Sequence, residues 1–153
     1  MRLLHYSAEK IGSLDDRNYN LLHTFRIKPV GLWVSVVGDC DWKWWCEAEN
    51  FNLGRLLYAH EVMLKDDANI LYLKTAEEVL AFHKKFPYAT VRFCDETYEI
   101  DWLKVKKEYQ GIIIPEYHWK CRLDYMCSWY YGWDCASGCI WDLSCIKEFK
   151  VVE

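Results

Sequence analysis

Cysteine and histidine are among the side chains of this sequence that could bind a metal or take part in nucleophilic catalysis. The C-terminal third holds several cysteines near one histidine: His118, Cys121, Cys127, Cys135, Cys139 and Cys145. A structural zinc site needs two closely spaced ligand pairs, and only the isolated "CASGC" has such a gap. The spacing favours packed, reduced thiols. A thiolate activated by a histidine is a further possibility, although no local signature of a cysteine protease is present.

A histidine at the end of an apolar strand is the second candidate for chemistry. The opening "LLHYS" places His5 two residues before a hydroxyl, that of Ser7. A histidine in such a place is more often a satisfied core residue than a functional one. Its meaning therefore depends on the side chains that the fold brings beside it.

The elements that must position these side chains can be predicted from periodicity and capping signals. Thr75 and Glu78 form a capping box ahead of apolar residues at helical spacing, which predicts a helix over 75–86. Asp41 and Asp101 precede two further helical patterns. Strands are predicted over 3–7, 28–38, 56–73, 111–114, 138–142 and 147–152. A turn at 65–69 breaks the strand material of 56–73. Residues 118–134 are predicted to be an ordered loop with a helical turn. We expect one mixed α+β domain.

Size and composition limit the classes of protein to which this chain can belong. A chain of 153 residues with 17% aromatic residues can build one ring-filled core, or it can bind a flat ligand. The net charge of −4 and the short basic clusters argue against a non-specific nucleic-acid binder. No signal peptide or membrane-spanning segment is evident, so we expect a cytoplasmic protein that does not enter membranes and whose thiols are reduced.

A set of short motifs resembles a known family. In chain order, "LLHYS", "GLWVS", "DWKWWC", "YAHEVML" and "SGCIWDLSCIKEFKVV" resemble the ADP-ribosyltransferases of the His-Tyr-Glu type, the class of poly-ADP-ribose polymerases and diphtheria toxin. The match spans most of the chain. It implies a single domain over 1–153, with split mixed or antiparallel β-sheets flanked by short helices. It also implies NAD as substrate.

The resemblance assigns NAD-binding roles to the first strand. It implies that His5 hydrogen-bonds the adenosine ribose and that Ser7 assists there. The backbone of Tyr6, which replaces the usual glycine of the family, would hold the nicotinamide amide.

The same resemblance assigns aromatic residues to the NAD site. Trp33 in "GLWVS" falls where the family places its first tyrosine, and Ser35 of that motif is assigned to the site with it. Trp45 falls near the tyrosine that stacks on nicotinamide. A tryptophan face can stack on a pyridinium ring at least as well as tyrosine, partly through a cation–π attraction of ~0.5–2 kcal/mol.

The catalytic carboxylate is the decisive residue, because cleavage of the nicotinamide–ribose bond passes through an oxocarbenium-like state. Aligning "GCIWD" with the late strand of the family places Ser137 at the usual glutamate and Asp142 at the strand-ending aspartate. Asp134, three residues earlier, is the nearest acid and the first candidate for the missing charge, with Ser137 lining the site. Glu116 is the second candidate.

Three hypotheses follow. The chain is an ADP-ribosyltransferase-like enzyme that transfers ADP-ribose from NAD to a protein, a nucleic acid or a small molecule. Alternatively, it is a binding protein on the same fold that recognises NAD, a nucleotide or a partner without transfer. A third hypothesis is a small structural or interaction protein whose tryptophans are simply core. The size is compatible with a phage or bacterial effector.

Overall fold

The computed structural model describes residues 1–15, 19, 28–88 and 99–152. The strands are β1 (Leu3–Ser7), β2 (Leu32–Val36), β3 (Tyr58–Leu64), β4 (Ile70–Tyr72), β5 (Gly111–Ile114), β6 (Ser137–Ile140) and β7 (Ile146–Val151). The helices are α1 (Trp42–Glu49), α2 (Ala76–Lys85), α3 (Trp102–Glu108) and α4 (Trp119–Arg122), with the 3-10 helices η2 (Leu53–Arg55), η3 (Tyr125–Gly132) and η4 (Leu143–Cys145). Within these ranges, no helix combines the length and apolar character needed to cross a bilayer.

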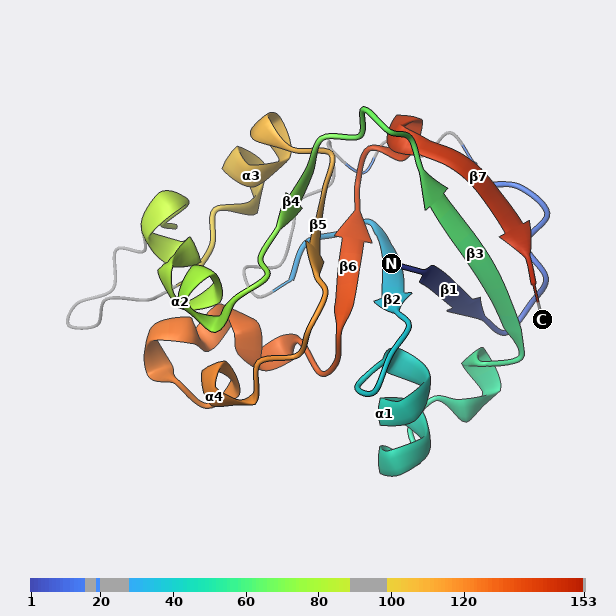
Figure 1. The fold of residues 1–153 in the computed structure, drawn as a ribbon, viewed down its shortest axis with the longest axis horizontal. Helices are drawn as coiled ribbons and strands as arrows, with labels where there is room; N and C mark the ends of the chain where they lie inside the picture. Colours follow the sequence, from blue (N-terminus) through green and yellow to red (C-terminus); the bar gives the residue numbers. More distant parts are fainter. Residues whose placement is uncertain (16–18, 20–27, 89–98, 153) are drawn as a thin grey trace.

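The strands form one mixed sheet of seven strands in the order β4-β5-β6-β2-β1-β3-β7 (Figure 1). β4 and β5 run parallel, and every other neighbouring pair is antiparallel. The mixed α+β class predicted from the sequence is confirmed. The expectation of separate, split sheets is not met, because β1 and β2 hydrogen-bond to each other and join the two halves into a single sheet.

The junction between β1 and β2 is short and opens into a fork. The two strands pair only at Leu3↔Val36 and Leu4↔Ser35. Beyond these pairs β1 stays with β3 and β2 stays with β6, and Figure 1 shows the two strands diverging. Because each half of a sheet twists, so short a pairing lets the halves turn away from each other. The fork lies between the second half of β1 and the first half of β2.

Side-chain caps begin the helices at the predicted residues. The hydroxyl of Thr75 accepts the N–H of Glu78 at 3.2 Å, and the carboxylate of Glu78 accepts the N–H of Thr75 at 3.0 Å, which completes the predicted capping box of α2. Asp41 caps α1 by accepting the N–H of Trp44 at 2.8 Å. Asp101 caps α3 in the same way. The observed caps confirm the three helices predicted from the sequence.

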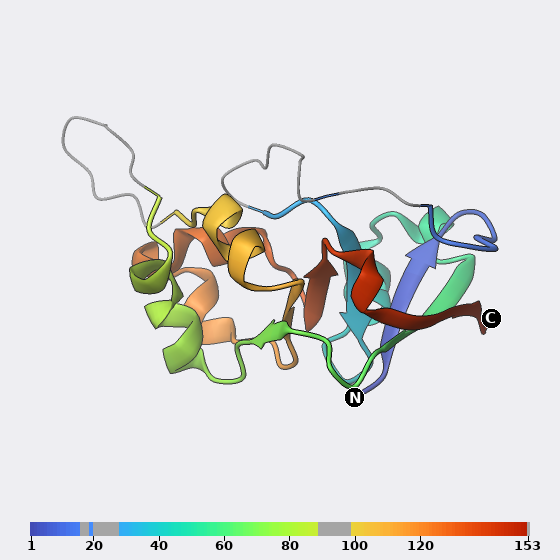
Figure 2. The same ribbon diagram turned by 90° about the horizontal axis from the view of Figure 1, so that it is seen from above.

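Helices α2, α3 and α4 gather at the β4–β5 end of the sheet (Figure 2). The core between them and the sheet is filled by rings, as the composition predicted, and each of these tryptophans is at most 1% exposed: Trp102, Trp129, Trp133 and Trp141. Residues 118–134, predicted to be a loop with a helical turn, instead form α4 and η3 and supply much of this core. In β5, Ile112 and Ile114 face the helices, whereas Ile113 packs on the opposite face.

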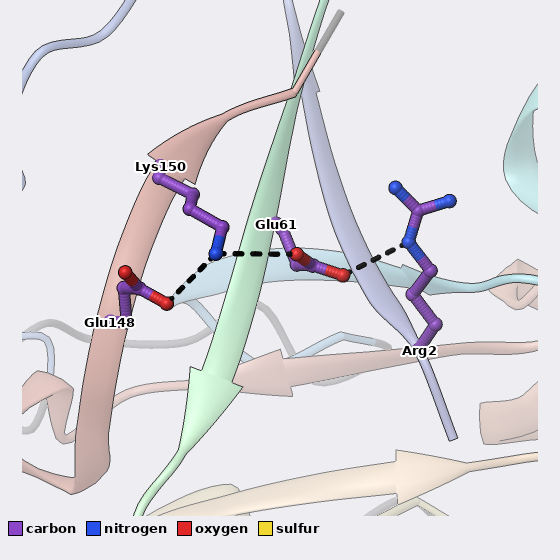
Figure 3. A network of polar contacts seen from close by, with 4 residues as sticks. All are labelled: Arg2, Glu61, Glu148 and Lys150. Atoms are coloured by element: carbon purple, nitrogen blue, oxygen red, sulfur yellow. Dashed lines mark hydrogen bonds and ion pairs between the residues drawn. The ribbon is translucent and has the colours of Figure 1, made fainter.

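Charged side chains cover the other end of the sheet. Glu61 of β3 accepts a hydrogen bond from Nε of Arg2 at 3.0 Å, and its second oxygen lies 3.9 Å from Nζ of Lys150 in β7 (Figure 3). Lys150 also donates to Glu148 at 3.1 Å. Exposed pairs of this kind stabilise a fold little. Charged side chains on an outer strand such as β7 disfavour its pairing with another chain.

Candidate functional site

A cavity of about 580 Å³ lies at the fork between β1 and β2. Its volume is within the ~300–1,000 Å³ typical of small-molecule sites. Residues 4–6 of β1 and residues 32–35 of β2 form two of its walls. The remaining wall is made by Ile11, Ser13, Leu14, Asp15, Tyr19, Lys28, Gly31, Trp42, Asn52, Arg55, Trp133, Asp134, Cys135 and Ser137.

Most of the site residues expected from the sequence line this one cavity. From β1, β2 and the segment that enters β6, these are His5, Tyr6, Trp33, Ser35, Asp134 and Ser137. The tertiary structure thus brings together side chains that lie up to 132 positions apart in the chain.

Three expected residues lie outside the lining. Ser7 donates its hydroxyl hydrogen to the carbonyl of Glu9 at 2.5 Å. Trp45 stacks on Trp42 at 5.2 Å between ring centroids, and it is Trp42, one helical turn earlier, that reaches the cavity. Glu116 is exposed and not among the lining residues.

His5 bridges the fork with its side chain. Its Nδ1 lies 2.8 Å from the carbonyl oxygen of Trp33. A carbonyl can only accept, so Nδ1 carries the proton, and in the neutral ring Nε2 is left as an acceptor. Burial lowers the pKa of His5 below its usual 6.5, although the bond to Trp33 counteracts this. A neutral imidazole at neutral pH follows, with one acceptor nitrogen unused by the bond to Trp33.

A second histidine, His60 of β3, supports the wall beside His5. His60 is fully buried and stacks on Phe149 at 5.1 Å between centroids. Its Nε2 accepts the backbone N–H of Ile11 at 2.9 Å, and its Nδ1 therefore donates to the carbonyl of His5, 3.2 Å away. His60 thereby ties the segment that contains Ile11 to β1. His60 was not predicted as a site residue, because the alternation in "YAHEVML" indicates a strand but not which residues its side chains contact.

A buried lysine holds another part of the wall. Nζ of Lys106, in α3, donates to the carbonyls of Tyr19 and Val30 at 2.8 and 3.0 Å. Burial lowers the pKa of this ammonium group. Tyr19 itself lines the cavity and Val30 directly precedes the lining residue Gly31, so Lys106 holds the chain where it approaches β2.

Asp134 is the acidic group nearest the aligned glutamate position, and it is paired. Its carboxylate oxygens lie 3.5 Å from Nη2 of Arg122 and 3.9 Å from Nζ of Lys28. Burial raises the pKa of Asp134 above its usual 3.8, and these two cations oppose that shift. The ammonium group of Lys28 also lies 5.2 Å from the ring centroid of Trp33, on the cavity wall.

Two of the three serines of the lining, Ser35 and Ser137, form hydrogen bonds with the backbone. Ser137 donates its hydroxyl hydrogen to the carbonyl of Cys135 at 3.0 Å, and Ser35 accepts the N–H of Trp42 at 2.9 Å. Ser35 and Ser137 are direct neighbours across the β2–β6 pair. They therefore join β6, β2 and the start of α1 at the cavity floor, and neither can supply negative charge.

Trp33 and Trp133 form an aromatic wall. Their ring centroids are 4.9 Å apart in an edge-to-face arrangement. The indole N–H of Trp133 is buried without a hydrogen-bond partner in the described part of the chain. An unmet buried donor costs ~1–3 kcal/mol. Four lining residues were not predicted as site residues, because the sequence does not reveal how the elements that carry or flank them are oriented: Lys28, Trp42, Arg55 and Trp133.

The thiols of the described residues lack the features of a nucleophile or a metal site. Burial raises the pKa of Cys135, the cysteine in the cavity wall, to about 12, whereas nucleophilic cysteines have a lowered pKa. The seven cysteines described are free. Within the described ranges, no group of three or more His, Cys, Asp or Glu side chains is arranged so that it could hold a metal ion.

Comparisons with family models, curated proteins and solved structures found no match to this chain.

Proposed function

We propose that this protein binds NAD in the cavity at the β1–β2 fork and transfers ADP-ribose to a cytoplasmic acceptor, as the ADP-ribosyltransferases that its motifs resemble do. One observation carries this proposal. Of the eight residues assigned from the sequence to NAD binding or catalysis, six lie together on the wall of one cavity, four of them NAD-binding and two catalytic. β1, β2 and β6 are neighbours in the sheet, so their closeness follows from the topology. What supports the proposal is that these particular side chains border one cavity of a size that suits a small molecule.

The chemistry of the lining suits a nicotinamide dinucleotide. The acceptor nitrogen of His5 can take a hydrogen bond from a ribose hydroxyl. Trp33 offers an aromatic face at the cavity wall for a cationic pyridinium ring. Lys28 and Arg55 supply positive charge for phosphates.

Asp134 is the residue that we assign to the transfer step. The bond between C1′ of the ribose and the nicotinamide nitrogen breaks, and nicotinamide leaves with the bonding pair. A carboxylate in a partly buried wall stabilises the positive charge that develops on the ribose. The acceptor then bonds to C1′ and loses its proton. The acceptor is a protein, a nucleic acid or a small molecule.

Binding is tested first. NAD should quench the tryptophan fluorescence of the protein saturably, and His5→Ala should abolish the quenching. His118→Ala is the control, since it removes a histidine that does not line the cavity. Circular dichroism checks that both variants fold. If NAD leaves the wild-type fluorescence unchanged and calorimetry detects no heat of binding, the proposal fails.

Transfer is tested next, by mass spectrometry of cell extract incubated with the protein and isotopically labelled NAD. Asp134→Asn should lose labelling while it still binds NAD. Glu116→Gln is the matched control, because it neutralises an acid outside the cavity. Undiminished labelling by Asp134→Asn would remove Asp134 from the mechanism.

A second candidate function is binding of NAD or another nucleotide without transfer. Two observations favour it: Ser137 occupies the aligned glutamate position, and Asp134 is already paired with two cations. Saturable binding of NAD with neither labelled acceptor nor released nicotinamide would identify this function.

A further inference from the structure

Arg55 is a cation of the cavity wall, and no ion pair in the described part of the chain involves its charge. Arg55 is the last residue of η2. Its backbone N–H donates to the carbonyl of Asn52 at 2.8 Å, and this bond holds the 3-10 turn on which Arg55 lies. Among the described residues, no carboxylate forms an ion pair with its guanidinium group. Arg55 is exposed, so water can solvate its charge without a partner, but it also lines the same cavity as His5 and Trp33, where a ligand can reach it.

The cavity lining holds two cations, Lys28 and Arg55, and two carboxylates, Asp134 and Asp15, and Arg122 adds a third cation from outside the lining. Asp134 is shared by Lys28 and Arg122, so one carboxylate faces two positive groups. Lys28 is the looser partner, at 3.9 Å, and it also lines the cavity. The other carboxylate of the lining, Asp15, has an interaction of its own. An anionic ligand would therefore meet Lys28 and an unengaged Arg55.

We propose that the cavity selects ligands that carry a diphosphate, and that Arg55 is the residue that makes this selection, with Lys28 assisting. This inference rests on the proposed function, because it assumes that the cavity takes a nucleotide. The planar guanidinium group can donate two parallel hydrogen bonds to phosphate oxygens, which an ammonium group cannot do. Lys28 acts as a point charge that a phosphate shares with Asp134.

The test is isothermal titration of the full chain with three probes: NAD, nicotinamide riboside and inorganic pyrophosphate. Nicotinamide riboside keeps the ring and one ribose but lacks phosphate, whereas pyrophosphate keeps only the anion. The variants are Arg55→Ala and Arg55→Lys. The matched control is Lys43→Ala, which removes an exposed cation of α1 that does not line the cavity.

We expect Arg55→Ala to raise the Kd for NAD about five- to twentyfold, as the loss of a charged contact in a partly open site should. The Kd for nicotinamide riboside should stay within about twofold of wild type. Arg55→Lys should recover part of the loss, and Lys43→Ala should change neither Kd. Raising the salt concentration should weaken NAD binding more in wild type than in Arg55→Ala, because it screens the contact that the variant lacks.

Equal losses for NAD and nicotinamide riboside in Arg55→Ala would overturn the inference, since the residue would then support the fold rather than the phosphate. No loss for either probe would overturn it too. The salt dependence of wild-type binding gives a second readout if Arg55→Ala fails to fold, and a Kd insensitive to salt counts against the inference.

The same titrations distinguish failure of the proposed function from failure of the diphosphate inference. If neither NAD nor nicotinamide riboside binds but pyrophosphate binds and depends on Arg55, the cavity is an anion site and the NAD assignment is wrong. If NAD binds with no dependence on Arg55, the NAD assignment stands and only the diphosphate inference is lost.

Discussion

Buried thiols should make this protein lose stability in mild alkali. Cys127 is fully buried and Cys135 is 2% exposed, and burial raises the pKa of each thiol from 9.0 to about 12. In the unfolded chain both thiols regain their ordinary pKa. Between these values the unfolded state releases protons that the folded state keeps, so the free energy of unfolding falls as pH rises above about 9.

The size of the effect follows from the two pKa values. At pH 10 a thiol with a pKa of 9.0 is mostly ionised, whereas one with a pKa of about 12 is almost fully protonated. Each of the two thiols then lowers the free energy of unfolding by about 1.4 kcal/mol between pH 8 and pH 10. Together they remove about 2.7 kcal/mol, a large part of the ~5–15 kcal/mol that stabilises a typical domain.

Urea denaturation at pH 8 and pH 10, followed by circular dichroism in the presence of a non-thiol reductant, measures this loss. The variant Cys127→Ala/Cys135→Ala should be less stable at pH 8, because it leaves cavities. Its further loss between pH 8 and pH 10 should be smaller than that of wild type by about 2.7 kcal/mol. Cys40→Ala, which removes a partly exposed thiol, is the control. An equal loss in wild type and the double variant would refute the reasoning.

Three further predictions concern stability, and each is measured as a change in the free energy of unfolding in urea. Gly138→Ala should cost about 2–3 kcal/mol, since its new methyl group would lie 2.6 Å from the carbonyl oxygen of Ile112, whereas Gly38→Ala, with open space around it, should not show this loss. A cost below that of Gly38→Ala would contradict the close approach. Thr75→Ala should cost about 1 kcal/mol through loss of the α2 cap, and an unchanged value would mean that the capping box adds nothing. Lys150→Ala should change stability by less than about 0.5 kcal/mol, because its ion pairs are exposed, and a loss above 1 kcal/mol would show that the network in Figure 3 matters more than its exposure implies.

Local signals in the sequence were sufficient for most of the elements. The capping box of Thr75 and Glu78, and the caps Asp41 and Asp101, depend on contacts three residues apart, which any chain with this sequence can form. The β-branched run at 111–114 likewise predicted β5. Residues 118–134 were less predictable, because the burial of Trp129 and Trp133 against the sheet, rather than periodicity, holds α4 and η3 in place.

The site residues likewise include some that the sequence identified and others that only the tertiary structure places at the cavity. Motif positions identified His5 and Trp33, and closeness in the sequence to the aligned glutamate position identified Asp134; all three line the cavity. Only the tertiary structure chose Trp42 over Trp45, since both lie on one helix and the direction of α1 decides which ring reaches the fork.

What the sequence determined by itself is therefore the identity of the elements and of the side chains that β1 and β2 carry. Tertiary structure decided that these strands pair over only two residues and part, which creates the cavity. It also placed Lys28 and Arg122 against Asp134. The physical reason is that caps and alternation act over a few residues, whereas the charge at a site is set by groups distant in the chain.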